Sequence, residues 1–248
     1  MNIGFVILFF YRFAGGQSFH GEKRLVLHSS DDVFQELQNI RQEIQALKAE
    51  NSQLKTSLSA LKRDSGSLYT RWGRTTCGAN DTEKVYSGYA AGQQYNLPAG
   101  PSNFLCLPEN PDWAKYVDGI QNIGGRIYGT EYEMHHPDLF DPFPQPMHDE
   151  DVPCAVCRSP RTTTIMMPGK TSCYAGWTFE YTGYIMTGYN QEKASSEYSC
   201  IDADPEAVFH GEDNKNGKVL YFTEVECGSL PCQEYPNGRE LACVVCSK

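Results

Sequence analysis

Two Cys-x-x-C pairs are the residues of this sequence with the clearest capacity for chemistry. Cys154 and Cys157 lie in VPCAVCRSP, and Cys243 and Cys246 lie in LACVVCSK. Such a pair can form a redox centre, supply half of a zinc site, or give one cysteine to each of two different disulfides. The cellular compartment and the surrounding elements decide among these three uses.

The local sequence disfavours redox chemistry. A thioredoxin-like centre lies at the start of a helix, where the helix dipole lowers a thiol pKa, but both pairs here lie in β-type sequence. Zinc could take the four cysteines of the two pairs as its ligands, which would leave the other six cysteines without partners. Disulfides are therefore favoured, with zinc as the alternative.

Histidine and acidic side chains are the remaining candidates. His135, His136 and His148 lie among acids in EMHHPD and MHDED, and IDADPE contains Asp202, Asp204 and Glu206. These groups can bind a metal ion, but solvated loop residues and a capped turn are the simpler interpretations. No nucleophile with a base, metal-ligand set or phosphate loop stands out, so we expect a protein that is not an enzyme and that holds no cofactor or metal.

The composition disfavours some partners. The 248 residues carry a formal net charge of −10, and nucleic acids and anionic membranes both require clustered Lys and Arg. Hydrophobic residues make up 40 % of the chain, which is enough for a folded core. An acidic chain of this kind is not expected to bind either polyanion.

The N-terminus and the cysteine count indicate secretion. Residues 3–10 are an apolar run followed by small residues, which is typical of a signal peptide and which we place at 1–16. The run is too short for a membrane-spanning helix. Because no basic residue precedes it, an ordinary apolar segment is the alternative. Asn80 begins a glycosylation sequon, and ten cysteines, an even number, suit disulfides in a secreted protein.

Residues 31–63 carry a heptad repeat that predicts a coiled-coil stalk. Apolar residues alternate at spacings of four and three, with no Gly or Pro between them. The repeat places Leu37, Ile44, Asn51 and Leu58 at a positions and Val33, Ile40, Leu47, Leu54 and Leu61 at d positions. A single amphipathic helix packed on the globular part is the alternative interpretation.

Charges beside this repeat favour parallel chains in register. Each Glu at a g position would meet a basic e residue of a neighbour, which gives the pairs Glu36 with Arg41, Glu43 with Lys48, and Glu50 with Lys55. Asn51 would be buried against its own copy and would fix the register. Asn at an a position favours a dimer, whereas the mixture of Leu and Ile leaves a trimer open. DSGS, at 64–67, ends the helix as a hinge.

The remainder of the chain predicts a mainly β protein with two tandem subdomains, at 68–160 and 161–248. Short apolar or alternating runs are bounded by turn signals, and Asn216-Gly217 is a hairpin signal. The two halves share Tyr-x-Gly-Tyr, at 86–89 and 181–184, between cysteines that occur in the same order. We interpret the halves as a tandem duplication. Met134–Asp151, which contains four prolines, is expected to be a surface loop.

These cysteines and the junction VPCAVCRSPRTTTIMMPGKTSCYAGW resemble the C-terminal non-collagenous domain of type IV collagen. The similarity is closest to the short-chain, spongin-type collagens of invertebrates and covers about residues 68–248. The chain has no Gly-X-Y repeat, so it is not a collagen, and the coiled coil stands where the triple helix would be. The resemblance therefore raises the parallel trimer above the dimer.

The resemblance also implies a cysteine pairing. Within it, the first cysteine of each half bonds the last of the Cys-x-x-C, the second bonds the first of that pair, and a middle pair closes a small loop. Transferred to this sequence, the implied disulfides are Cys77–Cys157, Cys106–Cys154, Cys173–Cys246, Cys200–Cys243 and Cys227–Cys232.

The expected function is that of a secreted, oligomeric extracellular-matrix or assembly protein, with collagen-like heads on a coiled-coil stalk. The alternative is a secreted, multivalent, lectin-like protein, because three weak heads on one stalk gain avidity for repetitive glycans. The partners would accordingly be copies of this chain and either a matrix protein or a glycan.

Overall fold

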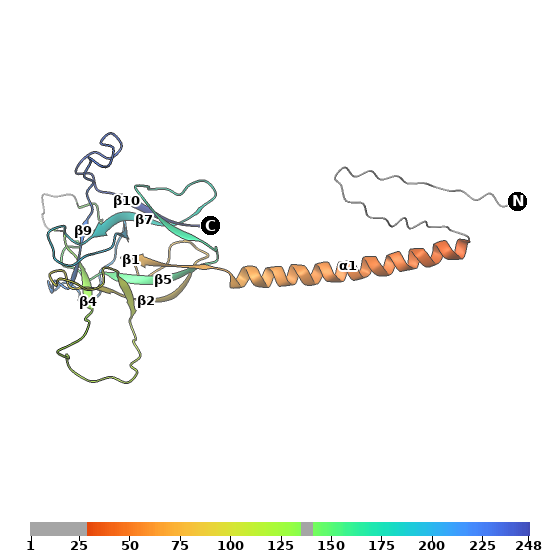
Figure 1. Cartoon of the computed structure of the whole chain (residues 1–248), viewed down its shortest axis with the longest axis horizontal. Coiled ribbons are helices and arrows are strands. Elements are labelled where there is room, and N and C mark those ends of the chain that lie inside the picture. The colour runs from red at the N-terminus through yellow and green to blue at the C-terminus, as the bar shows by residue number, and fades with distance from the viewer. Residues whose placement is uncertain (1–28, 135–140) are drawn as a thin grey trace. The chain divides into compact units, whose positions relative to one another are not determined.

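The structure is a computed structural model that describes residues 29–134 and 141–248. The predicted signal peptide at 1–16 and the histidines His135 and His136 lie outside the described residues. The chain divides into two compact units, Met1–Ser57 and Leu58–Lys248. Figure 1 shows a long helix in the N-terminal part and a β-rich C-terminal part.

Helix α1 spans Ser30–Asp64 and contains the predicted heptads. Ser29 caps its start, since the Ser29 hydroxyl accepts a hydrogen bond from the Asp32 amide at 3.3 Å. Asp31 and Asp32 in the first turn complement the helix dipole. The helix ends within DSGS, as the sequence predicts. Within the described ranges, no helix combines the length and apolarity that crossing a membrane requires.

Beyond the helix, the described residues form ten strands in one sheet. The first half supplies β1 (Ser67–Trp72), β2 (Glu83–Gly92), β3 (Leu105–Pro108), β4 (Tyr128–Tyr132) and β5 (Pro153–Ser159). The second half supplies β6 (Thr164–Pro168), β7 (Thr178–Thr187), β8 (Ser199–Asp202), β9 (Lys218–Phe222) and β10 (Ala242–Ser247). The protein is therefore mainly β with one described helix.

The strand pairs repeat from one half to the other. In the first half β5 pairs with β1 and β2, and β2 also pairs with β3 and β4, all antiparallel. In the second half β10 pairs with β6 and β7, and β7 also pairs with β8 and β9, again antiparallel. Each strand thus has a counterpart five strands later, as a duplicated sequence would produce.

Two parallel pairings join the halves into one sheet. Strand β4 pairs with β9 from Thr130 to Tyr132, and β1 meets β8 at Trp72 and Ile201. The core is shared as well, because its largest clusters contain buried side chains of both halves, such as Tyr132 with Leu220 and Ala155 with Ile185. The two predicted subdomains therefore contribute to one common sheet and core.

All ten cysteines are paired in five disulfides. The pairs are Cys77–Cys157, Cys106–Cys154, Cys173–Cys246, Cys200–Cys243 and Cys227–Cys232, the same pairs that the resemblance implies. Each Cys-x-x-C lies in a strand, so its two cysteines point to opposite faces and reach different partners. Neither a redox centre nor a thiolate zinc site is formed.

The repeated Tyr-x-Gly-Tyr has a structural cause. Tyr86 donates a hydrogen bond from its hydroxyl to the Cys106 carbonyl at 2.9 Å, and Tyr181 does the same to the Cys200 carbonyl at 3.0 Å. A Cβ added to Gly183 would lie 1.6 Å from the Ile201 carbonyl oxygen. The motif therefore fixes the close approach of the cysteine-bearing strand, β3 or β8, to the paired strand that carries the motif.

Two loop predictions need correction. Met134–Asp151 is not wholly a surface loop, because Phe143 and Met147 are buried in the core. Asn216-Gly217 makes a turn but no hairpin between β8 and β9, since β9 pairs with β4 and β7 instead. The amides of Lys215 and Asn216 both donate to the buried Glu131 carboxylate, which shapes this turn.

Candidate functional site

The apolar face of α1, formed by the a and d positions of the heptads, is exposed to solvent. The exposed fraction of its apolar side chains runs from 39 % at Val33 to 68 % at Leu61. The a-position residues Leu37, Ile44 and Leu58 and the d-position residues Ile40, Leu47 and Leu54 fall within this range. An apolar stripe of this length in contact with water is typical of a surface that binds another helix.

A second exposed apolar surface lies between β3 and β4. Residues 109–127, which we call the apolar arm, are all exposed and contain no strand. The arm carries Trp113, Tyr116, Val117, Ile120 and Ile123, and it projects from the sheet as a long loop (Figure 1). The base of the arm borders an open concavity of about 710 Å³. No local pattern predicts this exposure, since the same side chains would suit a core.

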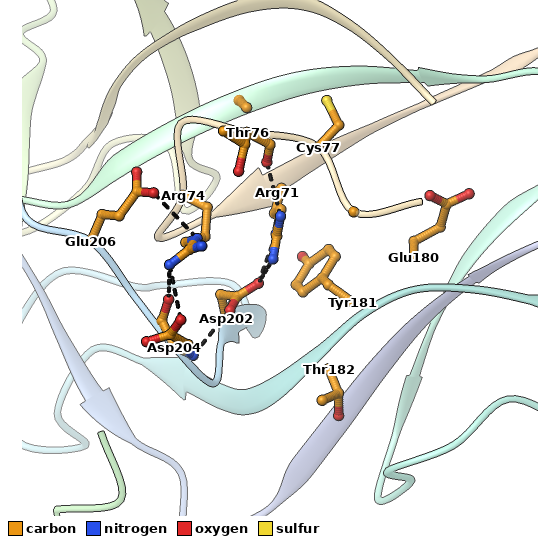
Figure 2. A network of polar contacts seen from close by, with 12 residues as sticks. Arg71, Arg74, Thr76, Cys77, Glu180, Tyr181, Thr182, Asp202, Asp204 and Glu206 are labelled. Atoms are coloured by element: carbon orange, nitrogen blue, oxygen red, sulfur yellow. Dashed lines mark hydrogen bonds and ion pairs between the residues drawn. The ribbon is translucent and has the colours of Figure 1, made fainter. Parts of the chain in front are cut away.

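The acids of IDADPE bind arginines of the first half (Figure 2). Arg71 donates to Asp202 Oδ2 from Nε at 2.7 Å, and its Nη2 lies 2.6 Å from the same oxygen. Arg74 pairs with Asp204 at 3.1 Å and with Glu206 at 3.3 Å. These carboxylates therefore tie β1 and the residues after it to the end of β8 and the segment that follows, and they are already neutralised, which argues against a calcium site.

Hydrogen bonds help to lower the pKa of the Glu206 carboxyl within this network. Burial would raise the pKa of the Glu206 carboxyl, but two hydrogen bonds from Thr75 and the charges of Arg74 and Arg71 outweigh burial and lower it. A lowered pKa in the folded state gives stability above the unfolded-state pKa, and this stability is lost as the pH falls through the folded-state pKa.

Replacing Asp202 with alanine is expected to destabilise the fold by about 3 kcal/mol, because it leaves the Arg71 guanidinium buried without its carboxylate. The two side chains are 6 % and 13 % exposed. Asp204→Ala is the matched control. The Asp204 side chain is 65 % exposed, so its loss should cost less than about 1 kcal/mol. Urea unfolding of both variants measures the difference, and equal losses would contradict the role of Asp202.

Glu180 is a buried carboxylate that the sequence analysis missed. It accepts hydrogen bonds from the hydroxyls of Tyr69 at 2.9 Å, Thr82 at 2.9 Å and Ser247 at 2.6 Å. Burial, together with the Glu180 charge, raises the pKa of the Tyr69 hydroxyl. Because Glu180 accepts hydrogen bonds from both halves of the β-rich part, we assign it a structural role.

The predicted glycosylation sequon lies beside this carboxylate. Asn80 is exposed on a turn, whereas the Thr82 hydroxyl of the same sequon donates to Glu180. A glycan on Asn80 would therefore meet solvent. The hydroxyl that the modification requires is engaged once the chain has folded.

Of the three midchain histidines, the structure describes His148. Its Nδ1 lies 3.8 Å from Glu133 Oε1 and its Nε2 lies 3.6 Å from Asp149 Oδ2. The motifs EMHHPD and MHDED contain these residues, but the sequence does not reveal that they meet. They make the one group of three or more His, Cys, Asp or Glu side chains with metal-binding spacing among the described residues.

No protein-family model matches the chain. Five disulfides fit an oxidising compartment, where such bonds form and persist. The function is therefore inferred from the helix, the disulfides and the exposed surfaces.

Proposed function

We propose that this protein is a secreted, oligomeric extracellular-matrix or assembly protein, in which α1 joins several disulfide-bonded β heads. The observation that carries the proposal is the exposed heptad face of α1. Removing apolar surface from water contributes about 25 cal/mol per Å², so a stripe of eight apolar side chains favours self-association. The proposal assigns the chain no catalytic role and no cofactor.

The charged positions beside the stripe support parallel chains in register. Glu36, Glu43 and Glu50 would face basic e residues of a neighbouring helix, and opposite charges at these positions select orientation. Asn51 would set the register by meeting its own copy. We favour three chains over two, because the resembled collagen domain ends a three-stranded rod.

The apolar arm supports association of the heads as well. Trp113, Val117 and Ile123 are exposed by 75 %, 77 % and 94 %, which is unusual for neighbouring side chains on a monomeric surface. Heads that are held close by a common stalk reach a high effective concentration. Weak contacts between arms would then add to the assembly.

Leu47→Asp is expected to convert the oligomer to a monomer at low micromolar concentration. The change places a charge in the middle of each apolar stripe, where every copy would meet the same charge. Light scattering coupled to gel filtration of the full secreted chain measures the mass. The native chain should have the mass of three copies.

Ala49→Asp is the matched control for this experiment. It introduces the same charge two residues further on, at an exposed f position outside the stripe, so the oligomer should persist. A native chain that stays monomeric up to millimolar concentration would contradict the proposal. A Leu47→Asp variant with unchanged mass would contradict it as well.

A lectin-like function is the second candidate. It is favoured by the exposed aromatic rings of Trp113 and Tyr116 on the arm, since such rings can stack on sugars. A glycan array probed with the native chain and with the Leu47→Asp variant separates the two functions. Sugar binding that requires the oligomer supports the lectin, whereas no sugar binding with assemblies that grow with concentration supports the matrix role.

A further inference from the structure

Three potential metal ligands come together where the chain leaves β4 and returns toward β5. Glu133 directly follows β4, and His148 and Asp149 precede β5. Backbone hydrogen bonds hold the two segments side by side. The Tyr132 amide donates to the Glu150 carbonyl at 2.9 Å, and the Asp149 amide donates to the Tyr132 carbonyl at 2.9 Å.

The donor atoms of these side chains converge. One atom from each of Glu133, His148 and Asp149 lies within 4.8 Å of the others. The Glu133 side chain is 5 % exposed, Asp149 is 23 % exposed and His148 is 43 % exposed. The group is thus anchored in the interior by a carboxylate and opens to solvent at the imidazole, which leaves a path for an ion.

A second observation points to a missing partner. The Asp149 Oδ1 atom is shielded from solvent and has no hydrogen-bond partner among the described residues. A shielded carboxylate oxygen without a partner is costly unless a proton donor or a cation meets it. Glu133 and Asp149 bring two carboxylates together here. A bound cation would compensate these charges.

We propose that Glu133, His148 and Asp149 form a binding site for a divalent transition-metal cation, with Zn²⁺ as the best-suited ion. Calcium and magnesium take oxygen ligands, whereas imidazole together with carboxylates suits zinc. Zinc binds such nitrogen and oxygen atoms at about 2.0–2.2 Å, which places two of its tetrahedral ligands roughly 3–4 Å apart. The 3.8 Å between His148 Nδ1 and Glu133 Oε1 fits this spacing. Asp149 lies 3.6 Å from the other ring nitrogen, so its carboxylate would have to turn toward the ion. Water would complete the coordination.

The imidazole is fixed by its surroundings. Met134 donates a hydrogen bond from its amide to His148 Nδ1 at 3.3 Å. Because Nδ1 accepts this hydrogen bond, Nε2 carries the ring proton in the metal-free protein. An ion would bind Nδ1 in place of the amide, and Nε2–H would go on donating a hydrogen bond, the usual arrangement of metal-bound histidine. Because all ten cysteines are in disulfides, no thiolate competes for the metal.

Isothermal titration calorimetry of the full chain with Zn²⁺ tests this site. We expect one saturable ion per chain, and the same ion should raise the thermal unfolding temperature. His148→Ala and Glu133→Gln should each weaken binding at least about tenfold, because even a supporting residue of a metal site is worth that much. Disulfide mapping and circular dichroism check that the variants fold.

His210→Ala is the matched control. His210 is an exposed histidine beside an acid, 3.9 Å from Glu212. Among the described residues it belongs to no group of three potential ligands, so its loss should leave binding unchanged. The proposal is overturned if the native chain binds no Zn²⁺ saturably or if His148→Ala binds it normally. It is also overturned if His135→Ala/His136→Ala abolishes binding while His148→Ala does not.

Discussion

The free energy of unfolding is expected to fall by about 4.5 kcal/mol when Cys77 and Cys157 are both replaced by alanine. The two cysteines are 80 residues apart, and closing a loop of this length restricts the unfolded chain by about that free energy. Cys157 is fully buried, so the loss of its sulfur also removes core contacts. Urea unfolding of the oxidised proteins measures the difference.

The Cys227→Ala/Cys232→Ala variant is the matched control. This disulfide spans 5 residues, so its removal should cost only about 2 kcal/mol. It lies in a segment that is mostly exposed, so little packing is lost with it. Equal destabilisation by the two double variants would contradict the view that the long loops dominate the stability of the heads.

Gly183→Ala is expected to destabilise the fold by at least about 3 kcal/mol. The new Cβ would lie 1.6 Å from the Ile201 carbonyl oxygen, and backbone of a paired strand cannot yield as a side chain does. The β7–β8 pairing around Gly183 and Asp202 would have to shift, and the Cys200–Cys243 disulfide opposes such a shift. Thermal unfolding and chemical denaturation both report the loss.

Two other glycines serve as a parallel case and a control for this prediction. Gly88, the counterpart of Gly183 in the first half, would place a Cβ 1.7 Å from the Leu107 carbonyl oxygen, so Gly88→Ala should cost a similar amount. Gly129 lies in β4 with nothing within 4 Å of its added Cβ, and Gly129→Ala should change stability by no more than about 0.5 kcal/mol. A Gly183→Ala protein with native-like stability would show that β7 and β8 do not approach each other so closely in solution.

Local patterns predicted the helix and several of the strands. The heptads and the lack of Gly and Pro predict α1, and alternating runs such as WTFEYTGYIM predict β7. The order of the cysteines supports the duplication, which the repeated strand pairs match. Self-association of α1 stays a prediction, because it concerns contacts between chains.

Long-range contacts could not be predicted in the same way. Two such contacts join residues far apart in the sequence: the pairing of β4 with β9 and the hydrogen bond between Arg71 and Asp202. Parallel strands are not connected by a tight turn, so no local turn signal predicts their pairing. Glu131 and Glu180 are buried, although a glutamate in a sequence predicts a solvated side chain. Phe143 enters the core from a proline-rich stretch whose composition predicts surface.

The exchange of strand contacts between the halves has a consequence for biosynthesis. The first half emerges from the ribosome with β1 and β4 still lacking β8 and β9, so its own sheet edges stay open until the second half has followed. Until the first half is fully bonded, Cys243 and Cys246 can compete with Cys154 and Cys157 for Cys77 and Cys106 once they emerge. Folding should therefore be slow, on the timescale of disulfide reshuffling. It should depend on a disulfide isomerase and on chaperones that cover the unpaired strand edges.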